Sequence, residues 1–283
     1  SFFKLSTTLY NAAFLQCRLT IFIVFNVNFA AMPITDTMNY PIKINPAPYS
    51  RTGDVDFDNI PFGRVYSDHM FIADYHRGTW NEARIVPFDN ISMPPTISAL
   101  HYGQIIFEGL KAFLDDNGIP TIFRPRKNQK RFKRSAERMA MPSVPEELFM
   151  SALTELVRLD REWIPKNNNS LYIRPFMFAT EEYIGVKPAD NFRFMIFTCP
   201  VGAYYNKPVR VLVSEEYVRA FKGGTGYAKA AGNYAATMYP VKQANKLGYD
   251  QLLWLDGCEF KYVHEIGTMN IFFVIDGTVI TPS

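Results

Sequence analysis

The sequence predicts a mixed α/β protein, of the α+β kind, with two domains. Its 283 residues are enough for two domains and a sizeable hydrophobic core. Short apolar runs bounded by turn residues predict strands, and other stretches repeat apolar residues at helical spacing. The segment Pro200–Pro208 interrupts this pattern and is the expected connection between the domains.

The part of the chain before this connection is expected to be rich in strands. Apolar runs are short there, and turn residues such as the Asn117-Gly118 pair separate them. Residues 105–114 are apolar and fit either a strand or a helix. Further strands are predicted within residues 54–75 and 81–100 and at residues 121–123, 171–178 and 192–198.

One helix is predicted close to residue 145. The run Ser143-Val-Pro-Glu146 fits a capping box, with Pro145 in the first turn of the helix. The apolar residues that follow repeat with a period of 3.6 and therefore share one helical face. These residues are Leu148, Ala152, Leu156 and Leu159.

The part after the connection is expected to mix strands with a second helix. This helix covers residues 234–247 and ends at Gly248, since glycine suits the left-handed position after a helix. Pro240 should kink the helix or mark an irregular turn. Asp276-Gly277 is a strong hairpin signal. The predicted strands are residues 209–214, 252–255, 270–275 and the short return 278–281.

Composition excludes several classes of protein. The chain is 48% hydrophobic and 20% charged, which is typical of a soluble globular protein and not of a disordered or membrane protein. A net charge of +3 is too small to indicate binding of nucleic acid. Cys17, Cys199 and Cys258 are far apart and odd in number, so they predict neither a disulfide framework nor a metal site. A reducing compartment is therefore expected.

The first residues have an unusual composition. Residues 1–35 contain no Asp or Glu, and residues 19–31 are apolar but too short to span a bilayer. A signal segment or an organelle transit peptide are two interpretations. We favour a third, in which this stretch lies upstream of the natural protein and translation starts at Met32 or Met38. The expected location is then cytoplasmic, or mitochondrial if residues 1–31 are a transit peptide.

Residues 223–235, GGTGYAKAAGNYA, place Lys229 among glycines and alanines. Small residues let the backbone and a ligand approach closely. A lysine in a crowded, poorly hydrated place can lose its proton and attack a carbonyl, which favours Schiff-base chemistry with pyridoxal phosphate. The alternative is a glycine-rich surface loop with a solvated lysine. Lys222 is the one serious competitor for the role.

Three other residues could serve such a cofactor, which needs an acid, a donor to its ring oxygen and a phosphate site. Glu265 leads into a buried strand and could hold a pyridine nitrogen, or it could be a surface turn residue. Tyr234 could donate to the ring oxygen, or serve only in packing. Arg131 lies in a run of basic residues, and arginine binds phosphate with two hydrogen bonds. The residues alone leave each alternative open.

From about Met38 to Ser283 the chain resembles the branched-chain amino acid aminotransferases, pyridoxal phosphate-dependent enzymes of fold type IV. Seven ordered motifs carry the resemblance, which makes it specific. They are FGRVYSDHM (62–70), LHYGQIIFEGLKAF (100–113), FRPRKNQKRFKRSAERM (123–139), LYIRPFMFAT (171–180), GGTGYAKAAGNYAA (223–236), YDQLLWLDG (249–257) and EIGTMNIFFV (265–274).

The resemblance implies a role for particular residues. Lys229 would be the Schiff-base lysine and the proton carrier. Contacts to the cofactor are implied for Arg131 at the phosphate, Tyr234 at the ring oxygen, Glu265 at the pyridinium nitrogen, and also for Thr268. The implied substrate pocket contains Phe62, Tyr102, Phe107, Tyr172 and Arg174, of which Arg174 helps to accommodate a glutamate side chain. No metal is expected.

The resemblance also implies the domains and the reaction. A small α/β domain would cover residues 38–202, a loop residues 203–208, and an incomplete, larger β-rich cofactor-binding domain residues 209–283, with residues 1–37 as an extension outside the core. The implied reaction moves an amino group between leucine, isoleucine or valine and 2-oxoglutarate. A homodimer is implied, because the loop with Tyr102 reaches the partner's active site in this family.

The resemblance also leaves two alternatives and one expectation about the end of the chain. The alternatives are another fold-type IV enzyme, such as a D-amino acid aminotransferase or an aminodeoxychorismate lyase, and a non-catalytic protein on the same scaffold. Family members continue past the position of Ser283, with residues that complete the phosphate site. The chain is therefore expected to be truncated and to bind the cofactor weakly or not at all.

Overall fold

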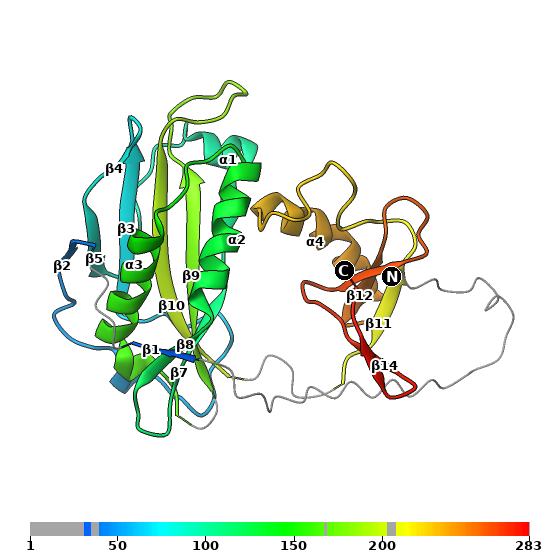
Figure 1. The fold of residues 1–283 in the computed structure, drawn as a ribbon, viewed down its shortest axis with the longest axis horizontal. Coiled ribbons are helices and arrows are strands. Elements are labelled where there is room, and N and C mark those ends of the chain that lie inside the picture. Colours follow the sequence, from blue (N-terminus) through cyan, green and yellow to red (C-terminus); the bar gives the residue numbers. More distant parts are fainter. Residues whose placement is uncertain (1–30, 35–39, 167–168, 203–207, 283) are drawn as a thin grey trace, which may run out of the picture. The chain divides into compact units, whose positions relative to one another are not determined.

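A computed structural model describes residues 31–34, 40–166, 169–202 and 208–282 of the chain (Figure 1). The chain divides into two compact units. The N-terminal unit contains the described residues of 29–206 together with Tyr227–Gly232, and the C-terminal unit contains those of 207–226 and 233–283. The segment around Lys229 thus groups with the N-terminal unit, whereas the sequence had placed it in the domain of residues 209–283. Residues 1–30, for which a signal or transit segment was one interpretation, and most of the expected loop 203–208 lie outside the described residues.

A large sheet forms the frame of the N-terminal unit. In the described residues it has ten strands in the order β1-β8-β7-β9-β10-β3-β5-β2, with β4 beside β3 and β6 beside β9. Neighbouring strands are antiparallel, except that β2 runs parallel to β5. The strands are β1 Ala31–Pro33, β2 Ile42–Ile44, β3 His69–His76, β4 Thr79–Trp80, β5 Ala83–Pro87, β6 Ile105–Phe107, β7 Leu110–Leu114, β8 Pro120–Phe123, β9 Ser170–Ala179 and β10 Phe192–Val201.

The long central strands confirm the predictions for residues 171–178 and 192–198. They bury side chains along most of their length, as their apolar sequences predict. Residues 105–114, which fitted a strand or a helix, form β6 and β7 with a break at Glu108 and Gly109. Strand β1 lies within the segment 1–37 that was expected outside the core, and it pairs with β8 at one edge of the sheet.

Two helices of the N-terminal unit were not predicted. They are the short α1, Ser98–Tyr102, and α2, Pro125–Arg138. Only one side of α2 is solvated, because Gln129, Phe132, Ser135 and Ala136 are buried on the other.

Helix α3, Glu146–Leu159, is the predicted one, and its apolar face is buried against the sheet. The predicted capping box is wrong. Pro145 occupies the N-cap position in an extended conformation, and no side chain caps the helix. A cap by Ser143 would require helical backbone at Val144. Val144 precedes Pro145, and the proline ring disfavours the helical conformation of the residue before it.

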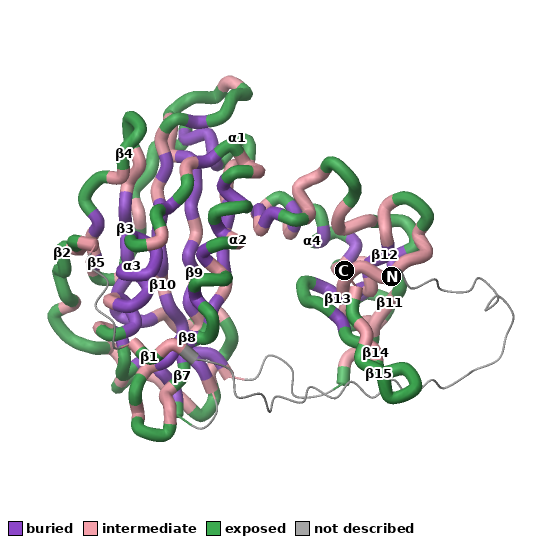
Figure 2. Tube along the Cα trace, in the orientation of Figure 1, coloured by how far each residue is buried: buried purple, intermediate pink, exposed green. Residues whose placement is uncertain are grey.

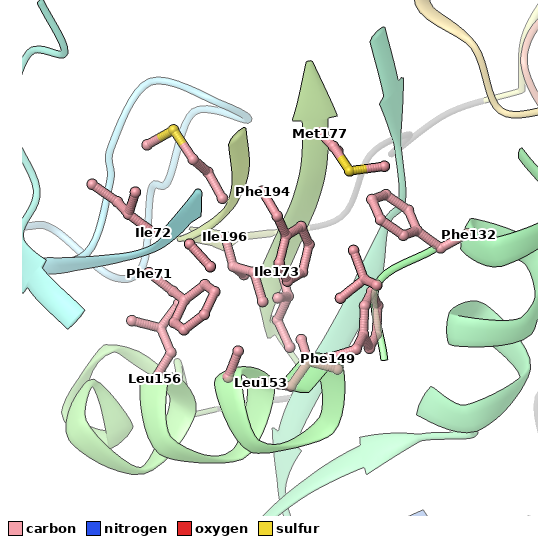
Figure 3. Packing of buried hydrophobic residues seen from close by; sticks show 14 of the residues in the cluster. Phe71, Ile72, Phe132, Phe149, Leu153, Leu156, Ile173, Met177, Phe194 and Ile196 are labelled. Carbon is pink, nitrogen blue, oxygen red and sulfur yellow. The ribbon is translucent and has the colours of Figure 1, made fainter. Parts of the chain in front are cut away.

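Phenylalanine rings join α2 and α3 to the sheet in one core (Figure 3). Phe132 of α2, Phe149 of α3 and Phe194 of β10 lie with their ring centroids 5.5–5.7 Å apart. Each of the three is buried. Burial of such a side chain contributes about 1.5–3 kcal/mol. This packing fixes the position of α2, the helix that carries Arg131.

The C-terminal unit has a much smaller core (Figure 2). Strand β11 runs parallel to β12, and β13 pairs with β12 in the opposite direction. Its hydrophobic cluster consists of the buried Ala244, Leu252 and Trp254, with partly buried apolar residues packed around them. The elements are β11 Val211–Ser214, α4 Ala231–Lys246, β12 Gln251–Leu255, β13 Val263–Ile266, β14 Phe273–Ile275 and β15 Thr278–Ile280.

Several predictions for the C-terminal unit are confirmed. Strands β14 and β15 form the predicted hairpin, with positive φ at both Asp276 and Gly277, as a type I′ turn requires. Gly248 follows α4 with φ +82°, in the left-handed region expected there. Helix α4 begins three residues earlier than predicted and continues through Pro240.

The buried thiol of Cys199 makes the stability of the fold depend on pH. Burial raises the pKa of Cys199 from 9.0 to about 11, although the charge of Arg174 opposes the shift. The native state keeps the thiol protonated, so its stabilising contribution is complete below pH 9 and is lost as the pH rises through about 11. Between pH 8 and 11 the free energy of unfolding should fall by about 2 kcal/mol more in the wild type than in Cys199→Ala. Urea titrations at several pH values measure this difference.

The exposed Cys258 provides the control. Cys258→Ala should follow the pH dependence of the wild type. If Cys199→Ala also follows it, the thiol is not held neutral by burial.

Candidate functional site

The segment around Lys229 is attached to the large sheet through its main chain. The Phe107 N–H donates to the Lys229 carbonyl at 3.0 Å, and Ile106 forms an antiparallel bridge with Ala230. Ala228 and Ala230, on either side of the lysine, are buried. The small residues that drew attention in the sequence thus let this segment lie beside the strand.

A buried serine on α2 holds the other side of the lysine backbone. The Lys229 N–H donates to Ser135 Oγ at 2.9 Å. The same hydroxyl donates to the Arg131 carbonyl, one helical turn earlier, at 2.9 Å. Ser135 has no exposed surface and was missed in the sequence analysis. Its only signal there was its position four residues after Arg131, which places the two on one side of a helix.

The lysine side chain lies beside an aromatic ring that it shares with an arginine. Lys229 Nζ is 4.8 Å from the centroid of the Phe107 ring, and Arg174 Cζ is 4.5 Å from the same centroid. Two cations at this distance from one ring are within the range of cation–π attraction. The Lys229 amine and the Arg174 guanidinium therefore both lie beside the Phe107 ring.

Tyr172 and Phe62 extend this group of residues. Arg174 Nη2 donates to the Tyr172 hydroxyl at 2.8 Å, and the Phe62 ring meets the Tyr172 ring edge-on, with centroids 5.8 Å apart. Burial raises the pKa of Tyr172, and the neighbouring Arg174 opposes the shift. A Cβ atom on Gly109 would lie 2.4 Å from the Tyr172 hydroxyl oxygen, so the absence of a side chain at Gly109 lets the Tyr172 ring approach the backbone in this position.

Five of the predicted site residues thus come together in the N-terminal unit: Phe62, Phe107, Tyr172, Arg174 and Lys229. A sixth, Arg131, is connected to Lys229 through Ser135. The Arg131 side chain is 43% exposed and forms an ion pair with the buried Glu108. Glu108, like Ser135, was not identified from the sequence as a site residue.

Three predicted residues belong to the C-terminal unit. Glu265, on β13, forms an ion pair with Arg219, whose Cζ lies 6.0 Å from the centroid of the Tyr234 ring. Both charged side chains are largely buried. Thr268 is exposed in the turn that follows β13. Arg219 was missed in the sequence analysis, because nothing in its local pattern distinguishes it from other surface arginines.

Tyr102 and Lys222 lie apart from this group in their contacts. Tyr102 ends α1, and its hydroxyl donates to the carbonyl of Ile184. Lys222 is exposed in a turn of the C-terminal unit. Lys229, with its main chain held on two sides, is the better placed of the two candidate lysines.

The side chains of the N-terminal unit fit the pyridoxal phosphate that the resemblance implied. An amine for the aldehyde, a guanidinium for the phosphate and an aromatic wall are all present there. Within the described residues, the buried Nε of Arg174 has no hydrogen-bond partner. An anionic ligand would satisfy this donor. In the same described ranges, no three His, Cys, Asp or Glu side chains are grouped closely enough to hold a metal ion.

Curated relatives are similar to most of the chain. It is 52% identical over 234 residues to Branched-chain-amino-acid transaminase 1 of Bacillus subtilis (strain 168), an alignment that covers 81% of this chain and 66% of the relative. It is 43% identical over 256 residues to a branched-chain-amino-acid aminotransferase of Mycolicibacterium smegmatis, covering 88% of this chain and 66% of the relative. The chain thus spans just under two thirds of the length of these relatives.

Solved structures of branched-chain aminotransferases are also similar to this chain. The branched-chain aminotransferase of the archaeon Thermoproteus uzoniensis, solved with norvaline, matches with a TM-score of 0.59 and 27% identity, over 75% of this chain and 68% of that one. The Escherichia coli branched-chain amino acid aminotransferase matches with a TM-score of 0.63 and 26% identity, over 76% and 67%. The two-domain α+β fold of type IV that the sequence predicted is therefore confirmed.

The sequence model of one family covers most of the residues of the site described above. The family is described as Amino-transferase class IV, and its model matches residues 106–283, which is more than half of the chain. The matched region begins at β6 and contains Phe107, Arg131 and Lys229. This protein belongs to the class IV aminotransferases.

Proposed function

We propose that the chain belongs to a transaminase that moves the amino group between a branched-chain L-amino acid and 2-oxoglutarate. The observation that carries the proposal is the Lys229 amine, held beside Phe107 and Arg174 in the N-terminal unit. The names of the relatives support transamination and the branched-chain amino acid, and the resemblance in sequence suggests 2-oxoglutarate as the acceptor. The chain itself supplies a lysine in a setting where its side chain can react.

The proposed cofactor is pyridoxal phosphate, which supplies an aldehyde for the amine and a ring that withdraws electrons from the substrate Cα. Lys229 would hold the aldehyde and, once displaced by the substrate amine, carry the proton that leaves Cα. Arg131 would bind the phosphate. Tyr234, Glu265 and Thr268 are proposed as further contacts to the cofactor. The ion pair of Glu265 with Arg219 supports an ionised carboxylate, the form needed beside a protonated ring nitrogen.

The proposed pocket accepts two kinds of side chain. Phe62, Phe107 and Tyr172 present aromatic surface to a branched aliphatic side chain. Because one methylene is worth only about 1–3 kcal/mol in such a pocket, leucine, isoleucine and valine should all react. Arg174, with its unmet Nε donor among the described residues, suits the carboxylate of a glutamate side chain. Tyr102 is proposed to contact substrate in the partner of a homodimer.

The homodimer and the cytoplasmic location stay predictions. Apolar side chains near Tyr102 are exposed, which supports a homodimer: these are Leu100, Tyr183, Ile184 and Val186. No helix in the described part of the chain has the length and apolar character needed to cross a membrane.

Lys229→Ala tests the proposed reaction in the complete protein. The wild type with pyridoxal phosphate should show a visible absorbance band and convert leucine and 2-oxoglutarate to glutamate. The variant should lose the band, and its kcat should fall by about 10³-fold or more, because it has no amine to hold the aldehyde or carry the proton.

Lys222→Ala is the matched control, since it removes a lysine seven residues earlier. It should keep both the band and the activity. A Lys229 variant as active as Lys222→Ala would contradict the proposal, and so would a wild-type protein that transaminates D-alanine but not leucine.

Ser135→Ala tests whether the backbone of Lys229 must be held. Without the hydroxyl, the half-buried Lys229 N–H loses its acceptor, which should lower the free energy of unfolding by about 1 kcal/mol. The kcat for leucine should fall about tenfold with little change in KM, because the amine is less well placed.

Ser151→Ala is the control for stability alone. Ser151 is also a buried serine in a helix, and its hydroxyl accepts the backbone N–H of Tyr40. It should destabilise the fold without lowering kcat. Equal losses of kcat in the two variants would mean that Ser135 contributes only to stability.

A further inference from the structure

Glu108 is a fully buried carboxylate at the site for which the proposed reaction gives no role. It follows β6 directly and has no exposed surface. Its backbone N–H donates to the Pro175 carbonyl on β9 at 2.7 Å, which fixes the residue to the sheet. A buried charge is costly unless it is paired and hydrogen-bonded, so its partners indicate what it is for.

Four N–H groups bond to this carboxylate. Arg131 Nε donates to Oε1 at 2.5 Å and Arg131 Nη2 donates to Oε2 at 2.8 Å. Asn128 Nδ2 and the Gly109 backbone N–H donate to Oε2 at 2.9 Å and 3.2 Å. The two bonds from Arg131 are the bidentate arrangement that fixes the plane of a guanidinium.

The pair is unequal in its exposure to solvent. The Glu108 side chain is 0% exposed, whereas that of Arg131 is 43% exposed. A carboxylate inside the protein therefore holds a guanidinium at its surface. Stability alone is a poor reason for such a pair, because apolar residues of similar volume often stabilise a fold as well or better.

The backbone of Arg131 is fixed as well. Its carbonyl accepts the Ser135 hydroxyl that also binds the Lys229 N–H. Ser135 thus sets the distance between the main chains of Arg131 and Lys229, and Glu108 sets the direction of the guanidinium. A donor held in place before its ligand arrives costs little to reorganise on binding.

We propose that Glu108 is a positioning residue that directs Arg131 toward the phosphate group of pyridoxal phosphate. The inference rests on the proposed function, in which Arg131 binds that phosphate. This positioning role differs from a role in which the Glu108 carboxylate only neutralises the charge of Arg131. A carboxylate that merely neutralised Arg131 would weaken phosphate binding, whereas one that positions Arg131 strengthens it.

Glu108→Gln separates these roles because it keeps the size of the side chain and removes its charge. Binding of pyridoxal phosphate and of pyridoxal, which lacks the phosphate, is measured by absorbance titration of the complete protein. The variant should bind pyridoxal phosphate about tenfold more weakly and pyridoxal within about twofold of the wild type. The ratio of the two affinities is the readout, and a merely structural role would leave this ratio unchanged.

Glu146→Gln is the matched control. Glu146 forms an exposed ion pair with Arg126, which also lies on α2, so the variant changes the net charge by the same amount. It should leave both affinities unchanged. Asn128→Ala, which removes a single donor to Glu108, should shift the ratio in the same direction by a smaller factor. This variant provides the test if Glu108→Gln does not fold.

Three results would overturn the inference. Tighter binding of pyridoxal phosphate by Glu108→Gln would mean that the carboxylate only neutralises Arg131. Equal weakening for both ligands would mean a structural role. Both results leave the proposed function standing, because the wild type binds the cofactor in either case. A wild type that binds neither ligand would overturn the proposed function and this inference with it.

Discussion

The main-chain hydrogen bond between Phe107 and Lys229 holds the Lys229 segment beside β6. It places a segment from far along the sequence beside β6, within the N-terminal unit. The small side chains of Ala228 and Ala230, on either side of the lysine, are buried there. The ring of Phe107 then contacts the lysine side chain, so one residue holds both the main chain and the amine. The other features of the site depend on this attachment.

Buried, hydrogen-bonded polar groups complete the site. Ser135 and Glu108 are both fully buried, and each is satisfied by hydrogen bonds that reach a residue proposed to act on the cofactor. Helix α2 supplies Ser135 and Arg131 on the side that faces the sheet, and Phe132 anchors the same helix in the core. The aromatic core thus positions the polar site. A change in the packing of α2 would move Ser135 and, through its hydrogen bond, the backbone of Lys229.

The sequence predicted the parts of the molecule that depend on local patterns. Apolar runs identified β9 and β10, and Asp276-Gly277 identified the hairpin. Lys229 was identified by the glycines and alanines around it. Helix α2 was not predicted, because its basic residues mask an apolar face of only a few side chains. The cap at Ser143 was wrong because Pro145 restricts the residue before it. Ser135, Glu108 and Arg219 could not be identified, because their roles arise from contacts with residues distant in sequence.

Hydrogen exchange at single amides tests the attachment of the lysine segment most directly. The amides of Phe107 and Lys229 donate the two hydrogen bonds that hold this segment. Measured by NMR in the complete protein, both should exchange slowly, at rates close to those of core amides in β9 and β10. The amide of Lys222, in an exposed turn, should exchange rapidly. If the Lys229 amide exchanged as fast as that of Lys222, the lysine segment would not be held against β6, and Lys229 would not be positioned to react.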